Sequence, residues 1–238
     1  NFRVSMDIFE EIAKLRVARK MWHDLLRDRY GITDPKASRM RIHVVTAGSA
    51  MTYQEPMNNI VRGTIMALAA VLGGTQSLGV SGYDEALSIP SDHAHLMSIR
   101  IQQILQEETG LASVADPLGG SFYIESLCNE LESRSWEIFN EIQNQGGFVT
   151  TVENGWLRGK ASEEQQNLAK RFEQSDMKLV GVNAHQIADP ILHVDGFEGS
   201  SGDATWSDAM DRLKDLRRTR DTNMALDSLR ELESVCKS

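Results

Sequence analysis

The feature of this sequence that most constrains its fold is an alternation of short apolar segments and longer amphipathic segments between residues 40 and 117. The short segments are rich in β-branched side chains such as Ile42, Val44 and Val45, which favour strands. The longer segments repeat apolar residues at helical spacing and stop at glycines. Strands that alternate with helices of this length are typical of parallel βα units. The predicted strands are Met40–Val45, Thr75–Val80 and Leu111–Ala115. The predicted helices are 58–72, capped by Asn58 or Asn59, and 91–108, capped by Ser91 or Asp92.

The rest of the chain is predicted to be mainly helical. Asp7–Arg27 mixes apolar residues at helical spacing with many charged residues, as an amphipathic helix does. Three strands can neither close a barrel nor cover their own sheet edges, so the chain is expected to be part of a larger sheet. The other predicted segments are helices at Ser121–Gln145, Gln165–Phe172 and Ser207–Val235, and a short extended piece at Leu179–Asn183.

Composition limits the class of partner and the compartment. With 34 acidic and 25 basic residues and a net charge of −9, the chain is a poor match for nucleic acid. No apolar run is long enough to span a membrane, and no signal peptide is visible. Two cysteines far apart in the sequence, Cys128 and Cys236, indicate a reducing compartment, so a cytoplasmic protein is expected. The chain begins Asn-Phe-Arg rather than with methionine, which suggests a processed, trimmed or split product.

Two polar loops follow the predicted strands 40–45 and 75–80. They form the candidate ligand site, because parallel α/β folds bind ligands at the carboxyl ends of their strands. His43 stands just before the first loop, a position compatible both with a core histidine and with a ligand contact. Glu85 lies in the second loop, where its carboxylate can accept hydrogen bonds from a ribose or favour the start of a helix.

Other motifs carry no predicted chemistry. Gly73-Gly74 and Gly119-Gly120 fit neither the dinucleotide-binding pattern nor the P-loop pattern, and we interpret them as a helix end and a tight turn. His93 and His95 point to different faces of a helix start and are not expected to share a metal ion. The sequence predicts no metal site and no Ser-His-Asp or Cys-His arrangement.

Several segments, in collinear order over most of the chain, resemble motifs of the large (alpha) subunit of the methylmalonyl-CoA mutase family. They are E-I-A-K-L-R (11–16), R-I-H-V-V-T-A-G (41–48), P-M-N-N-I-V-R (56–62), G-G-T-Q-S-L (73–78), Y-D-E-A-L (83–87), Q-E-E-T-G (106–110), A-D-P-L-G-G-S (115–121) and G-V-N (181–183). Independent motifs at matching spacings make this resemblance specific.

The resemblance implies an α/β fold, the C-terminal part of a (β/α)8 TIM barrel in residues 1–117. A mainly helical region, residues 118–238, would lead from it toward a cobalamin-binding domain. Family members use adenosylcobalamin to make a 5′-deoxyadenosyl radical, which starts the migration of a carbonyl-CoA group. The implied protein is a fragment or split subunit, inactive without the N-terminal barrel portion and the cobalamin-binding subunit or domain. A homo- or hetero-oligomer is also expected, because the sheet edges need covering.

The resemblance also assigns site residues by motif position. The residues implied for the acyl-CoA substrate are Lys36, His43 and Gln76. Those implied for the cofactor are Gly48, against the corrin, Glu85, which would hold the adenosyl ribose, and Ser88, near the cofactor.

Two positions depart from the family pattern. Val45 stands where methylmalonyl-type mutases carry a glutamine in H-x-Q-T-x-G, and Ser81 stands where an asparagine helps to hold the adenosyl group. The D-x-H-x-x-G motif with the axial histidine, and the strands with the substrate-selecting tyrosine and arginine, are absent from this sequence. A methylmalonyl-CoA/succinyl-CoA type mutase is the first hypothesis, and an isobutyryl-CoA or 2-hydroxyisobutyryl-CoA type mutase subunit or a non-catalytic assembly partner is the alternative.

Overall fold

The computed structural model of the chain describes residues 1–87, 89–187 and 202–237. Among these residues, three short strands pair in parallel in the order β1-β2-β3. The strands are β1 (Phe2–Val4), β2 (His43–Thr46) and β3 (Ser77–Gly79). The chain divides into two compact units, Asn1–Val194 and Asp195–Ser238, and the sheet belongs to the first.

Helices make up most of both units. In the first unit the α-helices are α1 (Ile8–Tyr30), α2 (Asn58–Leu72), α3 (Asp92–Glu107), α4 (Phe122–Asn144), α5 (Phe148–Glu153) and α6 (Trp156–Glu173). Two short 3-10 helices, η1 (Gly48–Ala50) and η2 (Leu111–Ser113), also lie there. The second unit contains α7 (Gly202–Thr219) and α8 (Thr222–Lys237).

Local sequence signals explain where α1 begins and ends and where α3 begins. Asp7 caps α1 by accepting a hydrogen bond from the Glu10 amide at 3.2 Å. Gly31 ends α1 in the left-handed conformation, with φ of 65°. Ser91 caps α3 by accepting a hydrogen bond from the Ala94 amide at 3.2 Å. The helices predicted over 7–27, 58–72, 91–108 and 121–145 are confirmed, with small shifts at their ends.

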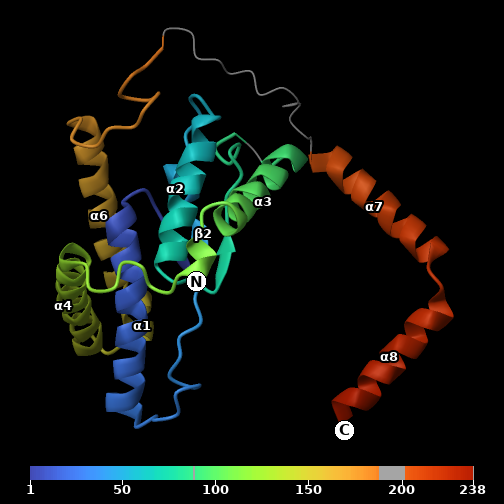
Figure 1. Cartoon of the computed structure of the whole chain (residues 1–238), viewed down its shortest axis with the longest axis horizontal. Helices are drawn as coiled ribbons and strands as arrows, with labels where there is room; N and C mark the ends of the chain where they lie inside the picture. Colours follow the sequence, from blue (N-terminus) through green and yellow to red (C-terminus); the bar gives the residue numbers. More distant parts are fainter. Residues whose placement is uncertain (88, 188–201, 238) are drawn as a thin grey trace. The chain divides into compact units, whose positions relative to one another are not determined.

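α1 and α2 cover one face of the sheet and form the main core with it (Figure 1). Val4 of β1 and Val44 of β2 are fully buried there, together with Leu15 of α1 and Met66 of α2. Burying a side chain of this size contributes about 1.5–3 kcal/mol relative to leaving it exposed. A second apolar cluster, between α2 and α3, consists of Ala67, Ile101 and Leu105.

The opposite face of the sheet is accessible. Paired residues of neighbouring parallel strands point to the same face, and here Arg3 pairs with Val45 while His43 pairs with Ser77. Arg3 and Ser77 are exposed, and His43 and Val45 are half-buried. The sheet therefore has one apolar face under helices and one open face with mostly polar side chains.

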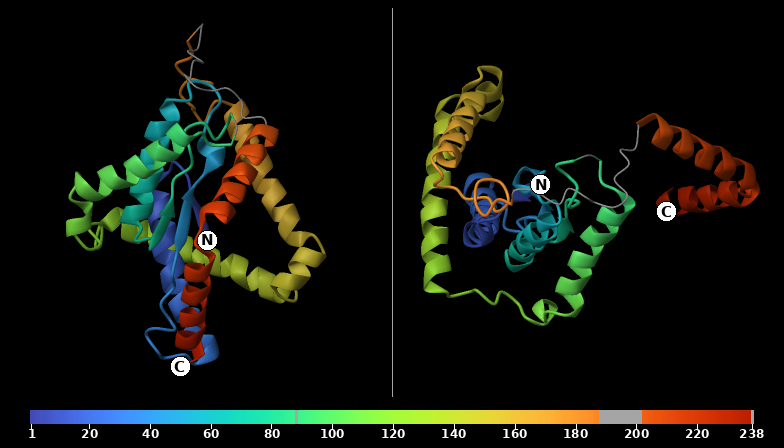
Figure 2. Two further views of the ribbon diagram at one scale, coloured as in Figure 1. Left: turned by 90° about the vertical axis from the view of Figure 1, so that its right-hand side faces the viewer. Right: turned by 90° about the horizontal axis from the view of Figure 1, so that it is seen from above.

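α4 packs across α1, as the left panel of Figure 2 shows. Arg16 of α1 forms ion pairs with Asp116 and with Glu125 of α4, the second at 3.0 Å. Pairs in contact with solvent contribute about 0.2–1 kcal/mol each. Ile124 of α4 is 1% exposed, so its buried apolar side chain stabilises the packing of α4 in addition to the ion pairs.

Two predicted elements are wrong. Leu111–Ala115 is not a strand, because the chain turns into η2 directly after Gly110, whose φ is 72°. Phe2–Val4 supplies the third strand instead, and three residues at the start of the chain are too few to show a periodicity. The long helix predicted over Ser207–Val235 is interrupted between Thr219 and Thr222, where α7 ends and α8 begins.

Details of three other predictions also change. Asn58 and Asn59 lie inside α2, and Met57 precedes the helix without a side-chain cap. The predicted helix 165–172 is the second half of the longer α6, and α5 was not predicted. Residues 179–183 form a turn closed by a bridge between Val180 and Ala184 rather than an extended piece.

The mainly helical second half of the chain and the small parallel sheet of its first half are as predicted. The described residues form an open sheet, so a closed (β/α)8 barrel stays a prediction. The predicted division between residues 117 and 118 falls inside the first unit, between η2 and α4, and also stays a prediction.

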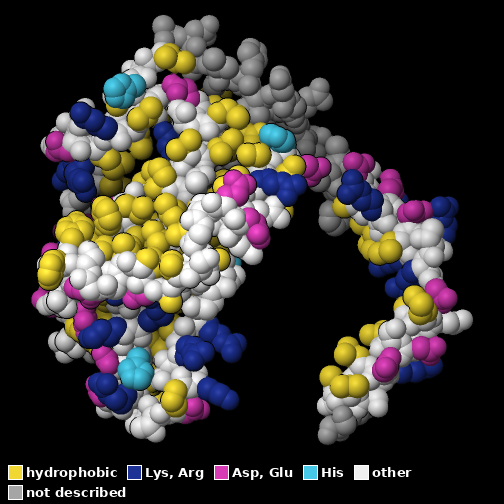
Figure 3. All heavy atoms as spheres, in the orientation of Figure 1, with side chains coloured by type: hydrophobic (Ala, Val, Ile, Leu, Met, Phe, Trp, Pro, Cys, Tyr) yellow, Lys and Arg dark blue, Asp and Glu magenta, His cyan; other side chains and the backbone are white. Residues whose placement is uncertain are grey.

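α7 and α8 carry exposed apolar side chains along their length, which Figure 3 shows in yellow. These side chains are Leu213 and Leu216 on α7 and Met224, Leu226, Leu229, Leu232 and Val235 on α8. Charged residues lie among them on both helices. None of the helices in the described ranges combines the length and the hydropathy needed to cross a membrane.

Candidate functional site

The loops after β2 and β3 meet at the carboxyl ends of the strands, where the sequence predicts the ligand site. Gly48 begins η1 directly after β2, and Glu85 lies in the turn after β3. A Cβ atom on Gly48 would lie 3.1 Å from both Cγ and Oε1 of Glu85. Gly48 and Glu85, two of the three residues that the resemblance assigns to the cofactor, are therefore in contact, and the missing side chain of glycine allows this approach.

The carboxylate of Glu85 is exposed, and it has no hydrogen-bond or ion-pair partner among the described residues. Its backbone amide donates to the Gly82 carbonyl at 3.1 Å, which fixes the turn. The residue lies well before α3, whose first turn carries Asp92 instead. This position argues against Glu85 as a helix-start carboxylate and leaves its oxygens available as acceptors.

His43 points to the open face of the sheet. Its Nδ1 lies 2.8 Å from the hydroxyl of Ser77, its neighbour on β3. This bond fixes the ring orientation, while the half-buried position leaves the other ring nitrogen on the accessible side. His43 is therefore not part of the apolar core, which lies on the opposite face of the sheet.

Gln76 and Lys36 lie toward the amino ends of the strands. Gln76 Oε1 accepts from the Ile42 amide at 2.7 Å and its Nε2 donates to the Gly74 carbonyl at 2.8 Å. Lys36 is exposed in the loop before β2, where its amide donates to Asp34 at 2.9 Å. The structure thus brings Gly48 and Glu85 together, with Gln76 and Lys36 at the other edge. Ser88 lies outside the described residues.

The loop after β3 is anchored by residues that the sequence did not single out for this role. Ser81 donates its amide to Thr46 Oγ1 at 2.8 Å and its hydroxyl to the Thr46 carbonyl at 2.9 Å. Asp84, which is 1% exposed, accepts from the Ser91 amide at 2.8 Å. These bonds join the start of the loop to β2 and its end to α3, so the backbone around Glu85 is held on both sides.

Tyr83 and His93 pack against each other beside this loop. The Tyr83 hydroxyl lies 3.1 Å from His93 Nδ1, and burial, as the larger cause, raises the pKa of the Tyr83 phenol, with Asp84 adding to it. Among the described residues, no group of three or more His, Cys, Asp or Glu side chains is placed to hold a metal ion.

A buried polar cluster beneath both loops was also missed, because the sequence presents its members only as part of P-M-N-N-I-V-R. Asn59, predicted as a possible helix cap, instead bonds to Thr52 and to the Tyr83 carbonyl. Arg62, one turn further along α2, bonds to the same Thr52 and Asn59. Nothing in the apolar pattern of α2 indicates that these two side chains point inward.

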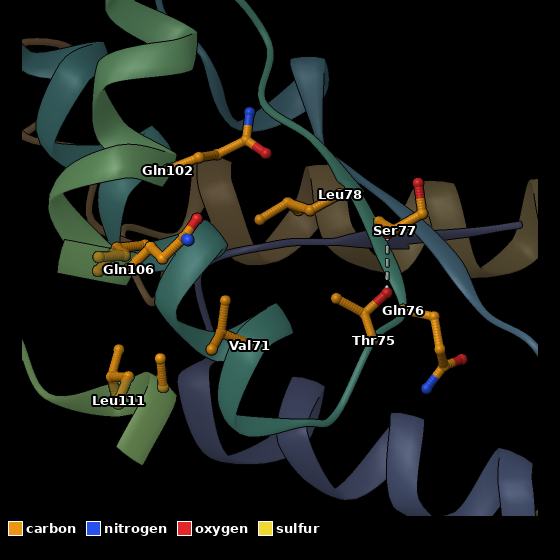
Figure 4. Close-up of a pocket in the computed structure, with 10 residues that line it drawn as sticks. Val71, Thr75, Gln76, Ser77, Leu78, Gln102, Gln106 and Leu111 are labelled. Atoms are coloured by element: carbon orange, nitrogen blue, oxygen red, sulfur yellow. Dashed lines mark hydrogen bonds between the residues drawn. The ribbon is translucent and has the colours of Figure 1, made fainter. Parts of the chain in front are cut away.

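A pocket of about 330 Å³ opens beside β3 and is lined by the ends of α2 and α3 and by η2 (Figure 4). Val71, Gln106 and Leu111 line it, and Gln76 is the predicted site residue that it includes. Helices of βα units run antiparallel to their strands, so the C-terminal ends of α2 and α3 lie at the amino ends of the strands. The pocket is therefore at the edge opposite to Gly48 and Glu85 and is not the candidate site.

Comparison with known proteins identifies relatives over the whole chain. The family model described as methylmalonyl-CoA mutase matches residues 1–238. The chain is similar to the 2-hydroxyisobutanoyl-CoA mutase large subunit of Aquincola tertiaricarbonis, with 36% identity over 233 residues, 97% of this chain and 41% of the relative. It is also similar to the methylmalonyl-CoA mutase of Rhizobium meliloti (strain 1021), with 35% identity over 100% of this chain and 33% of the relative. The methylmalonyl-CoA mutase of Escherichia coli (strain K12) is 38% identical over 78% of this chain and 26% of the relative. The chain thus spans between 26% and 41% of the length of these curated relatives.

Proposed function

Because this chain belongs to the methylmalonyl-CoA mutase family, we propose that it forms one wall of the active site of an adenosylcobalamin-dependent acyl-CoA mutase. The reaction is an intramolecular rearrangement of the carbon skeleton of a CoA thioester. The observation that carries the proposal is the contact between Gly48 and Glu85 above an open sheet face that bears His43. The remaining barrel strands and a cobalamin-binding domain or subunit are the proposed partners, since the chain spans only part of its relatives.

The acyl-CoA is proposed to lie along the open face, parallel to the strands. Lys36 at the amino-terminal edge is exposed, and its ammonium group suits a phosphate of CoA. His43, with Nδ1 bonded to Ser77, can offer Nε2 to the thioester carbonyl. Gln76 uses one lone pair and one N–H on backbone groups, so a second lone pair and a second N–H remain for CoA.

The residues at the carboxyl ends of the strands fit adenosylcobalamin. The Glu85 carboxylate accepts hydrogen bonds only, and its lack of a partner among the described residues leaves it available to ribose hydroxyls. Gly48 lets this carboxylate approach the backbone of the preceding loop, where the corrin is proposed to lie. When bound, the cofactor supplies the radical chemistry, while the residues of this chain orient the adenosyl group and help to exclude water. Ser88 is a further proposed cofactor contact.

Val45 favours a second candidate substrate, a short branched acyl-CoA without a second carboxylate, such as isobutyryl-CoA or 2-hydroxyisobutyryl-CoA. The Val45 side chain lies on the open face in register with Arg3, and an apolar side chain there suits a methyl group better than a carboxylate. The similarity to a 2-hydroxyisobutanoyl-CoA mutase large subunit supports the same class.

The test is turnover by the full-length protein, assembled with its cobalamin-binding partner and adenosylcobalamin. Methylmalonyl-CoA, isobutyryl-CoA and 2-hydroxyisobutyryl-CoA are each supplied, and the isomeric product is measured by mass spectrometry. We expect one of them to be isomerised, and the absence of turnover with all three contradicts the proposal.

A pair of variants separates catalysis from a purely structural role as an assembly partner. Glu85→Ala is expected to weaken adenosylcobalamin binding, whereas Glu107→Ala, which removes an exposed carboxylate at the end of α3, leaves it unchanged. Equal behaviour of the two variants favours the assembly partner.

A further inference from the structure

A buried polar cluster beneath the two ligand loops is not used by any substrate or cofactor contact proposed above. It consists of Thr52, Asn59 and Arg62, which we call the loop clamp. Thr52 lies in the loop after β2, and Asn59 and Arg62 are neighbours on one face of α2. Asn59 is 1% exposed, Arg62 7% and Thr52 8%, so the clamp is almost fully removed from water.

Asn59 joins the two loops. Its Oδ1 accepts from the Thr52 amide at 3.0 Å, and its Nδ2 donates to the Thr52 carbonyl at 2.8 Å. Nδ2 also donates to the Tyr83 carbonyl at 2.9 Å. Thr52 lies in the same loop as Gly48, and Tyr83 lies in the same turn as Glu85. One side-chain amide therefore spans the two segments that hold the proposed cofactor contacts.

Arg62 orients this amide and connects it to a third segment. Its Nη1 donates to Thr52 Oγ1 at 2.7 Å and to Asn59 Oδ1 at 2.8 Å, and its Nη2 donates to the Val180 carbonyl at 2.8 Å. All three acceptors are neutral. Burial, the larger effect, lowers the pKa of the Arg62 guanidinium, and the Glu55 carboxylate opposes it. Burying the Arg62 cation among neutral acceptors lowers the stability of the fold relative to an apolar side chain of similar size. We therefore attribute to Arg62 a role in fixing the geometry of the loops rather than in stabilising the fold.

The third segment, residues 177–184, lies directly against the loop after β2. Gly181 has φ of 80°, and a Cβ atom there would lie 2.9 Å from Cδ of Glu55. Glu55 itself adopts a positive φ of 46°, which non-glycine residues rarely do. Backbone conformations of this kind persist only where the surroundings hold them. The Val180–Gly181 turn is therefore a fixed support for this loop.

We propose that Asn59 and Arg62 are positioning residues. The loop clamp sets the separation between Gly48 and Glu85, and the support at Val180 fixes the clamp through Arg62. A Cβ atom added to Gly48 would lie 3.1 Å from Glu85, so the two loops approach closely, and a displacement of either loop changes where the Glu85 carboxylate points. The inference rests on the proposed function, because it takes Glu85 to hold the adenosyl group.

Asn59→Asp is the sharpest perturbation, because a carboxylate can still accept from Thr52 and Arg62 but loses the donor bonds to Thr52 and Tyr83. Asn140→Asp, at an exposed position of α4, is the matched control for the added charge. Thr52→Val removes the hydroxyl that accepts from Arg62 at nearly constant volume, and Thr52→Ser retains it.

Two quantities are measured in the full-length protein. The first is amide hydrogen exchange at Glu85 and Leu87, whose amides donate to Gly82 and Asp84 within the turn. The second is the dissociation constant of adenosylcobalamin beside that of the acyl-CoA. We expect Asn59→Asp and Thr52→Val to speed exchange in this turn about tenfold, the effect of losing roughly one net hydrogen bond. The same variants are expected to weaken adenosylcobalamin binding about tenfold and acyl-CoA binding less than about twofold, with Thr52→Ser and Asn140→Asp close to the parent.

Two results overturn the inference. One is unchanged exchange at Glu85 and Leu87 in both variants. The other is an equal acceleration throughout β2 and α1 with equal loss of both ligands, which identifies a general structural role. If the parent protein binds no adenosylcobalamin, the proposed function fails, while the exchange result still decides whether the clamp holds the turn.

Discussion

Replacing Gly48 by alanine tests the contact on which the candidate site depends. The new Cβ would lie 3.1 Å from Cγ and Oε1 of Glu85, a few tenths of an ångström inside the usual separation of about 3.5–4.0 Å. Gly48 has no positive φ, so alanine fits the backbone there. Because Glu85 is exposed, we expect its side chain to swing away rather than the backbone to shift. The free energy of unfolding should therefore change by less than about 1 kcal/mol, including the entropic benefit of alanine over glycine.

The displaced carboxylate should nevertheless lose its bond to the adenosyl group. A hydrogen bond to a charged group contributes about 1.5–3 kcal/mol, so adenosylcobalamin should bind about 10- to 150-fold more weakly. The assay is a spectroscopic titration of the full-length protein, with unfolding of each variant by urea as the measure of stability.

A double-mutant cycle makes the test specific. In the Glu85→Ala background there is no carboxylate to displace, so Gly48→Ala should cost less than about twofold in affinity. If Gly48→Ala weakens binding equally in both backgrounds, or destabilises the fold by several kcal/mol, the reasoning from this contact is wrong.

Four further outcomes are expected. Leu15→Ala, at a fully buried position, should lower the free energy of unfolding in urea by about 2–5 kcal/mol. Gly181→Ala should lower it by about 1–2 kcal/mol because of the positive φ, measured in the same way. The pKa of the Tyr83 phenol is raised in the folded protein, so its contribution to the free energy of unfolding is present below the ordinary pKa of about 10 and is lost as the pH rises through the pKa of the folded state. Tyr83→Phe should therefore reduce the loss of stability with rising pH, measured by unfolding curves from pH 8 to 11. Burial raises the pKa of the Cys128 thiol, so iodoacetamide at pH 8 should modify it more slowly than the exposed Cys236, as followed by mass spectrometry.

Sequence patterns predicted the elements whose signals are local. The cap at Asp7, the glycine end at Gly31 and the apolar spacing of α1 are all contained in neighbouring residues, and that helix is confirmed. The strand at Phe2–Val4 was missed because a three-residue strand is defined by its partner, β2, rather than by its own pattern. Leu111–Ala115 has the composition of a strand, but Gly110, in the left-handed conformation, directs it into a turn.

The same distinction applies to the candidate site. Positions after strands predicted that Gly48 and Glu85 lie at one edge of the sheet, and the structure brings them into contact. The roles of Asn59 and Arg62 could not be predicted, because their partners at Tyr83 and Val180 lie far away in the sequence. Buried polar networks depend on such tertiary partners, which helical periodicity does not report.

Ligand footprinting by hydrogen exchange of the full-length protein tests the central claim most directly, that this chain supplies an acyl-CoA face and a cofactor edge. Adenosylcobalamin should slow exchange in residues 47–52 and 81–87, and the acyl-CoA should slow exchange in residues 41–46 and 76–79. The claim is contradicted if neither ligand slows exchange in its own pair of segments. It is also contradicted if one ligand alone slows exchange equally in all four segments.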